Sequence, residues 1–250
     1  MNSSSGKNGG NFFSSAMLQM RQVLVCFCVA LIGLFGPKAF LYPSPAEIAS
    51  RPIPYQVISG ETLLDFRYNH PYIKPTVSSS LLFFTGVWIP LGIIGIIGLW
   101  YLRRNNTIML ESSLKIMCAF LMAIGMSECT TNLIKFWVLR PRPNFYEHCS
   151  FDISQKACMG SVNKIVESQL SFPSGHTSLS FCSTTVILLW LWNQIFSSSE
   201  KNQQNPFPRL TSFLLLWGWS TFVSVSRIVD YWHHPSDVVA GLLFGGDCGV

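Results

Sequence analysis

A series of long apolar segments is the feature that most constrains how this chain can fold. About 20 apolar residues in a helix are needed to cross the hydrocarbon of a bilayer. Five segments have this length and character: residues 22–42, 80–102, 113–137, 177–196 and 210–228. A sixth, residues 236–250, would rise only about 22 Å, which is short of a bilayer core of about 30 Å. We therefore expect an all-α fold, a polytopic membrane helix bundle of six spans with the sixth truncated at the C-terminus.

The composition indicates that much of the exterior faces lipid. Hydrophobic residues make up 49% of the chain and charged residues 12%, whereas a soluble domain carries about 25% charged residues. The net charge of +5 is modest and dispersed, which argues against a nucleic-acid partner. Residues 1–16, rich in Ser, Asn and Gly, predict a disordered cytoplasmic tail. Residues 17–250 are expected to form one membrane domain.

The alternation of spans assigns the connecting loops to two faces of the membrane. The long loops, residues 43–79 and 138–176, share one face. The short loops, residues 103–112 and 197–209, share the other face with the N-terminus. Lys and Arg are denser on the short-loop face, which predicts that this face is cytoplasmic. The long-loop face is then luminal or extracellular, in the plasma membrane or an endomembrane.

The cysteines do not indicate a metal site, because no CxxC pair occurs in the sequence. Cys149 and Cys158 lie nine positions apart in a polar loop. They could be bridged if that loop is luminal or extracellular, where disulfides form and persist. The sequence alone leaves this pairing open.

Polar side chains form three clusters, and the alternation of spans places all three on the long-loop face. In chain order they are Lys135 with Arg142, the run Ser174-Gly175-His176, and Ser226-Arg227 followed by His233 and Asp237. No histidine lies on the opposite face. We therefore expect one site at the ends of the third, fourth, fifth and sixth spans.

The composition of these clusters suits a bound phosphate. Guanidinium groups bind phosphate through paired hydrogen bonds, and a lysine adds a point charge. A serine is a favourable N-cap for the fourth span, and the backbone N–H groups after it would form an anion site in the first helical turn. The phosphate-binding residues are thus predicted to be Lys135, Arg142, Ser174, Gly175 and Arg227.

The remaining residues suit acid–base and nucleophilic chemistry. Asp237 follows His233 by four positions, so its carboxylate can reach back and accept a hydrogen bond from the imidazole. That bond would fix the tautomer and leave the other ring nitrogen free to attack. His176, from a different span, can supply the opposing acid or base. The predicted catalytic residues are His233, His176 and Asp237.

In these three clusters the sequence resembles the type 2 phosphatidate phosphatase superfamily. The family signature has three parts: Lys, six residues, Arg-Pro; then Pro-Ser-Gly-His; then Ser-Arg, five residues, His, three residues, Asp. Every signature position is present here at that spacing. The resemblance is closest to the eukaryotic lipid phosphate phosphatases, which tend to carry two cysteines after the first motif. It covers roughly residues 13–246, and the departure is the short sixth span.

The resemblance implies a lipid phosphate substrate and a metal-free, cofactor-free reaction through a phosphohistidine. By analogy His233 attacks phosphorus, Asp237 orients it, and His176 protonates the leaving oxygen and then activates water. The sequence does not determine which lipid phosphate is preferred or whether the protein forms a homo-oligomer.

Residues outside the signature receive weaker interpretations. Arg140 is interpreted as an interfacial anchor, and His234 as a supporting neighbour of the nucleophile. Asp230 is expected to pair with a local base or cap a turn. His70 and His148 are interpreted as surface histidines in polar loops.

Three rival classes share parts of this pattern. Vanadate-dependent haloperoxidases share the phosphate pocket but are soluble, which the apolar segments oppose. Lipid phosphotransferases keep the histidines and the aspartate but need not keep the Lys and Arg-Pro pattern. Transporters or inactive receptor-like relatives lose motif residues, and none is lost here.

Overall fold

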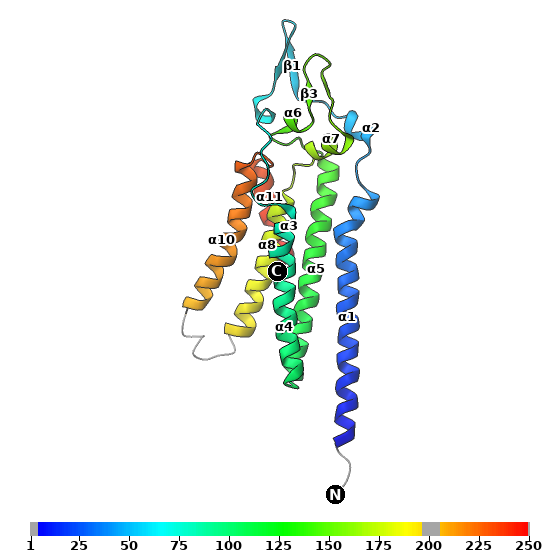
Figure 1. Cartoon of the computed structure of the whole chain (residues 1–250), viewed down its shortest axis with the longest axis vertical. Helices are drawn as coiled ribbons and strands as arrows, with labels where there is room; N and C mark the ends of the chain where they lie inside the picture. Colours follow the sequence, from blue (N-terminus) through cyan, green and yellow to red (C-terminus); the bar gives the residue numbers. More distant parts are fainter. Residues whose placement is uncertain (1–4, 197–205, 250) are drawn as a thin grey trace.

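The computed structural model describes residues 5–196 and 206–249, which form a bundle of long helices with a small cap at one end (Figure 1). The elements of the bundle are α1 (Ser5–Phe40), α3 (Ser79–Phe83), η2 (Phe84–Trp88), α4 (Ile89–Arg103), α5 (Thr107–Val138), α8 (Gly175–Trp190), η3 (Leu191–Phe196), α10 (Phe207–Val229) and α11 (Pro235–Gly249). The elements of the cap are α2 (Pro45–Ala49), β1 (Tyr55–Ile58), β2 (Glu61–Leu64), η1 (Phe66–Tyr68), α6 (Phe145–His148), β3 (Phe151–Asp152), β4 (Ala157–Cys158) and α7 (Val162–Ser168).

Within the described residues, four helical segments are long and apolar enough to cross a membrane. They are Met17–Phe40, Ser79–Arg103, Thr107–Val138 and Phe207–Val229. The prediction of a membrane-spanning helical bundle is confirmed for these four. Helix α8 has 16 residues and runs directly into the six residues of η3, and α11 has 15 residues; neither is among these four segments. Six spans therefore stay a prediction.

Helix α8 is rich in serine and threonine over residues 177–185, and it lies inside the bundle. Most of its serine and threonine side chains are buried, and Ser178 and Thr184 bond to neighbouring helices. Ser178 Oγ lies 2.7 Å from Ser127 Oγ on α5, and Thr184 Oγ1 lies 3.0 Å from Ser220 Oγ on α10. Such hydrogen bonds join helices in a membrane, where burial of apolar groups contributes little to association.

The N-terminal part of the chain differs from the expected disordered tail. Helix α1 begins at Ser5, so helical backbone covers most of the segment 1–16. Residues 1–4 lie outside the described part of the chain. Two short antiparallel hairpins, β1–β2 and β3–β4, also add strands to a fold expected to be all-α.

Close contact between α1 and α5 depends on small residues. A Cβ added to Gly125 would lie 2.7 Å from the Cα of Ala30, and one added to Gly33 would overlap the carbonyl of Gly125. Small residues let helix backbones approach closely in lipid. The contact places the end of α1 beside the end of α5.

Helix α11 packs against α8 in the same way, and this contact positions the predicted site. A Cβ on Gly241 would lie 2.5 Å from the carbonyl oxygen of Ser174, and one on Gly245 would overlap the carbonyl of Ser178. The backbone N–H of Ser174 donates to the carbonyl of Asp237 at 2.9 Å. The starts of α8 and α11 are thereby held together.

The cap joins the two long loops over one end of the bundle (Figure 1). Cys149 and Cys158 form a disulfide, which confirms the pairing that the sequence left open. Cys149 lies two residues before β3, and Cys158 is the last residue of β4. The backbone N–H of His70, in the first loop, donates to the carbonyl of Pro143 in the second at 3.1 Å. The first loop is therefore held against the part of the second loop that carries Arg142-Pro143 of the first motif.

Candidate active site

One cavity brings together most of the predicted site residues. It has a volume of about 410 Å³ and lies among α1, α3, α5, α8 and the turn that follows α10. Six of the predicted residues line it: Lys135, Arg142, Gly175, His176, Arg227 and His233. Ser174 and Asp237 do not line it and are fully buried behind its wall. The convergence expected from the order of the spans is present in the structure.

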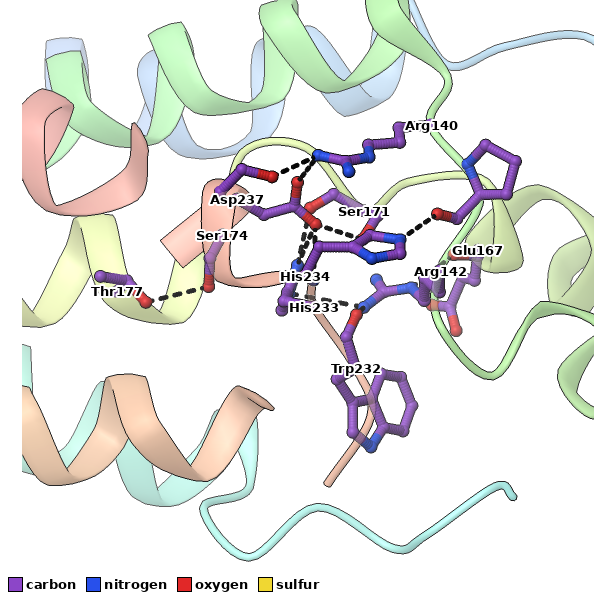
Figure 2. Close-up of polar contacts among 12 residues, drawn as sticks. Arg140, Arg142, Glu167, Ser171, Ser174, Thr177, Trp232, His233, His234 and Asp237 are labelled. Atoms are coloured by element: carbon purple, nitrogen blue, oxygen red, sulfur yellow. Dashed lines mark hydrogen bonds and ion pairs between the residues drawn. The ribbon is translucent and has the colours of Figure 1, made fainter. Parts of the chain in front are cut away.

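Arg142 is held in place by the protein backbone. Helix α5 ends at Val138, and its C-cap residue Leu139 has a left-handed conformation. The chain then passes through Pro141 and Pro143, which cannot continue a helix. The Arg142 Nε donates to the Glu167 carbonyl at 2.7 Å, and its Nη1 donates to the Trp232 carbonyl at 2.9 Å (Figure 2). Burial lowers the pKa of this guanidinium to about 10, so it stays charged at neutral pH.

Arg227 is almost fully buried at the end of α10. Its Nη2 donates to Ser226 Oγ at 3.0 Å and lies 3.3 Å from Asp230 Oδ2. Asp230 also accepts hydrogen bonds from the backbone and hydroxyl of Thr76, at 2.7 and 2.9 Å. The prediction that Asp230 pairs with a local base is confirmed, and the pair ties the first loop to the third motif.

Lys135 extends from α5 toward the start of α8. A Cβ placed on Gly175 would lie 3.7 Å from Lys135 Nζ, so the ammonium sits beside the first residue of α8. Ser174 occupies the N-cap position as predicted, but its side chain makes no capping bond to the backbone. Its Oγ instead accepts from Thr177 Oγ1 at 3.0 Å.

His233 is buried and held in one orientation. Its Nδ1 lies 2.6 Å from the carbonyl oxygen of Ser171. A carbonyl oxygen only accepts, so Nδ1 carries the proton and Nε2 has the free lone pair. Nε2 lies 3.5 Å from Arg142 Nη1, on the side of the cavity. Burial lowers the pKa of His233 to about 3, so the ring is neutral at physiological pH.

The expected direct hydrogen bond between Asp237 and His233 is not formed. Asp237 Oδ2 lies 3.8 Å from His233 Nδ1, beyond hydrogen-bonding distance. The carboxylate accepts instead from Ser171 Oγ at 2.6 Å and from the His234 backbone at 2.9 Å (Figure 2). The Ser171 hydroxyl and the His234 backbone N–H thus donate to the carboxylate in place of the His233 imidazole, which the spacing of four residues had predicted as the donor. Asp237 therefore acts on the ring through Ser171 and through its charge.

His176 lies in the first turn of α8 and faces the same cavity. Its Nε2 is buried without a hydrogen-bond partner among the described residues. A buried polar atom without a partner is costly in most proteins. At a cavity that gathers cations, this nitrogen is available to a bound molecule.

Three residues near the site were missed or misjudged from the sequence. Arg140, interpreted as an interfacial anchor, has its Nη1 2.5 Å from Asp237 Oδ1. Ser171, not identified at all, links Asp237 to His233. His148, interpreted as a surface histidine, is 5% exposed and packs against Trp232 with ring centroids 5.4 Å apart. For the contact between Arg140 and Asp237, the only signal in the sequence was the presence of a second arginine two positions before Arg142.

Fold and site together define an integral membrane protein with a cavity lined by three cationic side chains, Lys135, Arg142 and Arg227, and by two histidines. The family model described as the PAP2 superfamily matches residues 116–249. The chain is 31% identical to lipid phosphate phosphatase 1 of Arabidopsis thaliana over 198 residues, which is 76% of this chain and 57% of that protein. It is 30% identical to phospholipid phosphatase 1 of Rattus norvegicus over 246 residues, 89% of this chain and 80% of that protein.

The chain therefore belongs to the PAP2 superfamily. Human phospholipid phosphatase 2 is a further relative, 30% identical over 162 residues, 58% of this chain and 52% of that protein. The chain thus spans little more than half the length of the plant and human relatives. No solved structure matches it.

Proposed function

We propose that this chain hydrolyses phosphate monoesters of membrane lipids, such as phosphatidate, through a phosphohistidine on His233. The observation that carries the proposal is the tautomer of His233, whose Nδ1 donates to Ser171 while Nε2 lies toward the cavity. A neutral imidazole with a free lone pair is a nucleophile. Relatives named lipid phosphate phosphatase and phospholipid phosphatase support the substrate class.

In the first step, His233 Nε2 forms a bond to phosphorus while the bond from phosphorus to the lipid oxygen breaks. His176 donates a proton to that oxygen, and the negative charge of the bound phosphate favours the protonated form of its ring. The ring of His233 gains positive charge as the new bond forms. The buried carboxylate of Asp237, 3.8 Å from Nδ1, stabilises this charge.

In the second step, His176 accepts a proton from water, and the water oxygen forms a bond to phosphorus as the bond to His233 breaks. Inorganic phosphate leaves, and both histidines return to their starting states. The cations around the cavity, Lys135, Arg142 and Arg227, stabilise the phosphoryl oxygens in both steps.

The lining of the cavity supports a lipid as the phosphate's carrier. Besides the cations, it includes apolar side chains contributed by α3, α5, α8 and the loop before α8: Leu82, Phe83, Phe136, Leu170 and Leu179. Charged and apolar surfaces within one cavity suit a molecule with a phosphate at one end and a hydrocarbon at the other.

Removal of divalent metal ions should leave the activity intact. Three cationic side chains supply the positive charge that Mg²⁺ supplies in other phosphoryl-transfer sites. We expect purified protein in detergent micelles to release phosphate from phosphatidate equally well with and without excess EDTA. Loss of activity in EDTA that returned with Mg²⁺ would show that this part of the proposal is wrong.

We place the active site on the luminal or extracellular face. The disulfide of the cap lies on the same side of the bundle as the cavity and suits an oxidising compartment. The higher density of Lys and Arg on the short-loop face supports the same orientation.

A further inference from the structure

Glu128 is a buried carboxylate that the proposed reaction does not use. It lies inside α5, one of the four helices able to span a membrane, and is 8% exposed. Among the described residues, its hydrogen-bonding contact is with Asn132 Nδ2 at 3.5 Å. Ionisable residues inside spans are costly and generally functional. Glu128 and Asn132 both line the cavity that holds the phosphate-binding residues.

The position of Glu128 along α5 fixes its distance from the phosphate site. It precedes Lys135 by seven residues, close to two helical turns, so both residues lie on the same face. A Cβ built on Gly175 would lie 3.6 Å from the Thr131 methyl group and 3.7 Å from Lys135 Nζ. The Lys135 side chain therefore runs back along α5 toward Thr131. The ammonium is therefore at the level of Thr131. Glu128 lies about one turn closer to the N-terminus of α5 than Thr131, about 5 Å along the helix axis.

We propose that Glu128, with Asn132, binds a hydroxyl or ammonium group that the lipid carries next to its phosphorylated carbon. A phosphate held at Lys135 and His233 places the neighbouring carbons of its carrier within reach of the next helical turn. A carboxylate accepts a hydrogen bond from either donor. The site then favours lipid phosphates with a free donor, such as lysophosphatidate, over fully esterified ones. This inference rests on the proposed lipid phosphatase function.

A structural role for Glu128 makes a different prediction. Lys38, near the end of α1, also lines the cavity and could serve as the counter-ion of Glu128. If the carboxylate only held Lys38, its loss would affect the hydrolysis of all lipid phosphates alike. A loss of preference between two lipids therefore indicates that Glu128 binds the substrate, whereas an equal loss on both indicates that it only supports the cavity wall.

The experiment compares lysophosphatidate with an analogue of the same acyl chain that lacks the 2-hydroxyl group. For the wild-type protein we expect kcat/KM to be roughly ten- to a hundredfold higher for the hydroxylated lipid, the range for a hydrogen bond to a charged group. Glu128→Gln keeps an acceptor oxygen but loses the charge, so the ratio should fall. Glu128→Leu should bring it close to one.

Glu111→Gln is the matched control, because Glu111 lies at the other end of α5 and pairs with Lys115 at 2.8 Å on the exposed surface. It should keep the wild-type ratio. A wild-type ratio near one, or an equal loss on both lipids in the Glu128 variants, would overturn the inference while leaving the phosphatase function standing. If the wild-type protein released phosphate from neither lipid, the proposed function itself would fail. If Glu128→Leu does not fold, the wild-type ratio and its fall in Glu128→Gln still test the inference.

Discussion

Replacing His233 with alanine is expected to reduce phosphate release from phosphatidate to background, a loss of roughly 10⁴-fold or more, as is typical when a nucleophile is removed. The reason is that Nε2 of this ring presents a lone pair at the cavity, while Nδ1 is committed to the Ser171 carbonyl. The measurement is turnover of purified variant in detergent, on phosphatidate and on an aryl phosphate with an acidic phenol. Turnover of both substrates should be lost together, since a better leaving group cannot replace a missing nucleophile.

His70→Ala is a suitable control for that experiment. His70 stacks on Tyr231, with ring centroids 4.4 Å apart, and lies outside the cavity lining. Its loss should leave most of the turnover. Thermal unfolding of both variants would show whether either has lost its fold. Substantial activity in a folded His233→Ala protein would exclude His233 as the nucleophile.

Replacing His176 with alanine should separate the two steps of the reaction. On phosphatidate, turnover should fall by about 10²–10⁴-fold, the usual contribution of general acid–base catalysis. An activated aryl phosphate needs no proton on its leaving group, so its first step should proceed. The second step still lacks the base that activates water. We therefore expect a burst of phenol close to one equivalent per protein, followed by slow turnover.

Stopped-flow absorbance of the released phenol measures both phases directly. A deficit of equal size on both substrates, with no burst, would show that His176 acts in some way other than proton transfer to the leaving group. Rescue of His233→Ala by the aryl phosphate, with none for His176→Ala, would reverse the two assignments.

The sequence predicted the parts of the fold that depend on local composition. Four apolar segments became helices long enough to span a membrane. Residues 177–196 were predicted as the fourth span; they form α8 and η3, where most serine and threonine side chains of α8 lie in the interior of the bundle, and a span there stays a prediction. The start of α1 at Ser5 was also missed, because Gly and Asn are poor helix formers.

The convergence of the three motifs could be predicted because alternation of spans places their ends on one face. The individual contacts could not, since they depend on which groups compete for the same acceptor. The spacing between His233 and Asp237 predicted a direct bond, but the Ser171 hydroxyl and the Arg140 guanidinium occupy that carboxylate. Ser171 lies in the loop before α8, and its backbone N–H donates to the carbonyl of Arg140 at 3.0 Å, a contact between distant residues that no local pattern encodes.

The most direct test of the central claim is detection of the phosphoenzyme. Purified protein would be mixed with ³²P-labelled phosphatidate, quenched in alkali to preserve a phosphohistidine, and mapped by mass spectrometry. The account predicts label on His233, formed and lost at least as fast as turnover and absent from His233→Ala. Label on another residue, or steady phosphate release while wild-type protein never carries label, would contradict it.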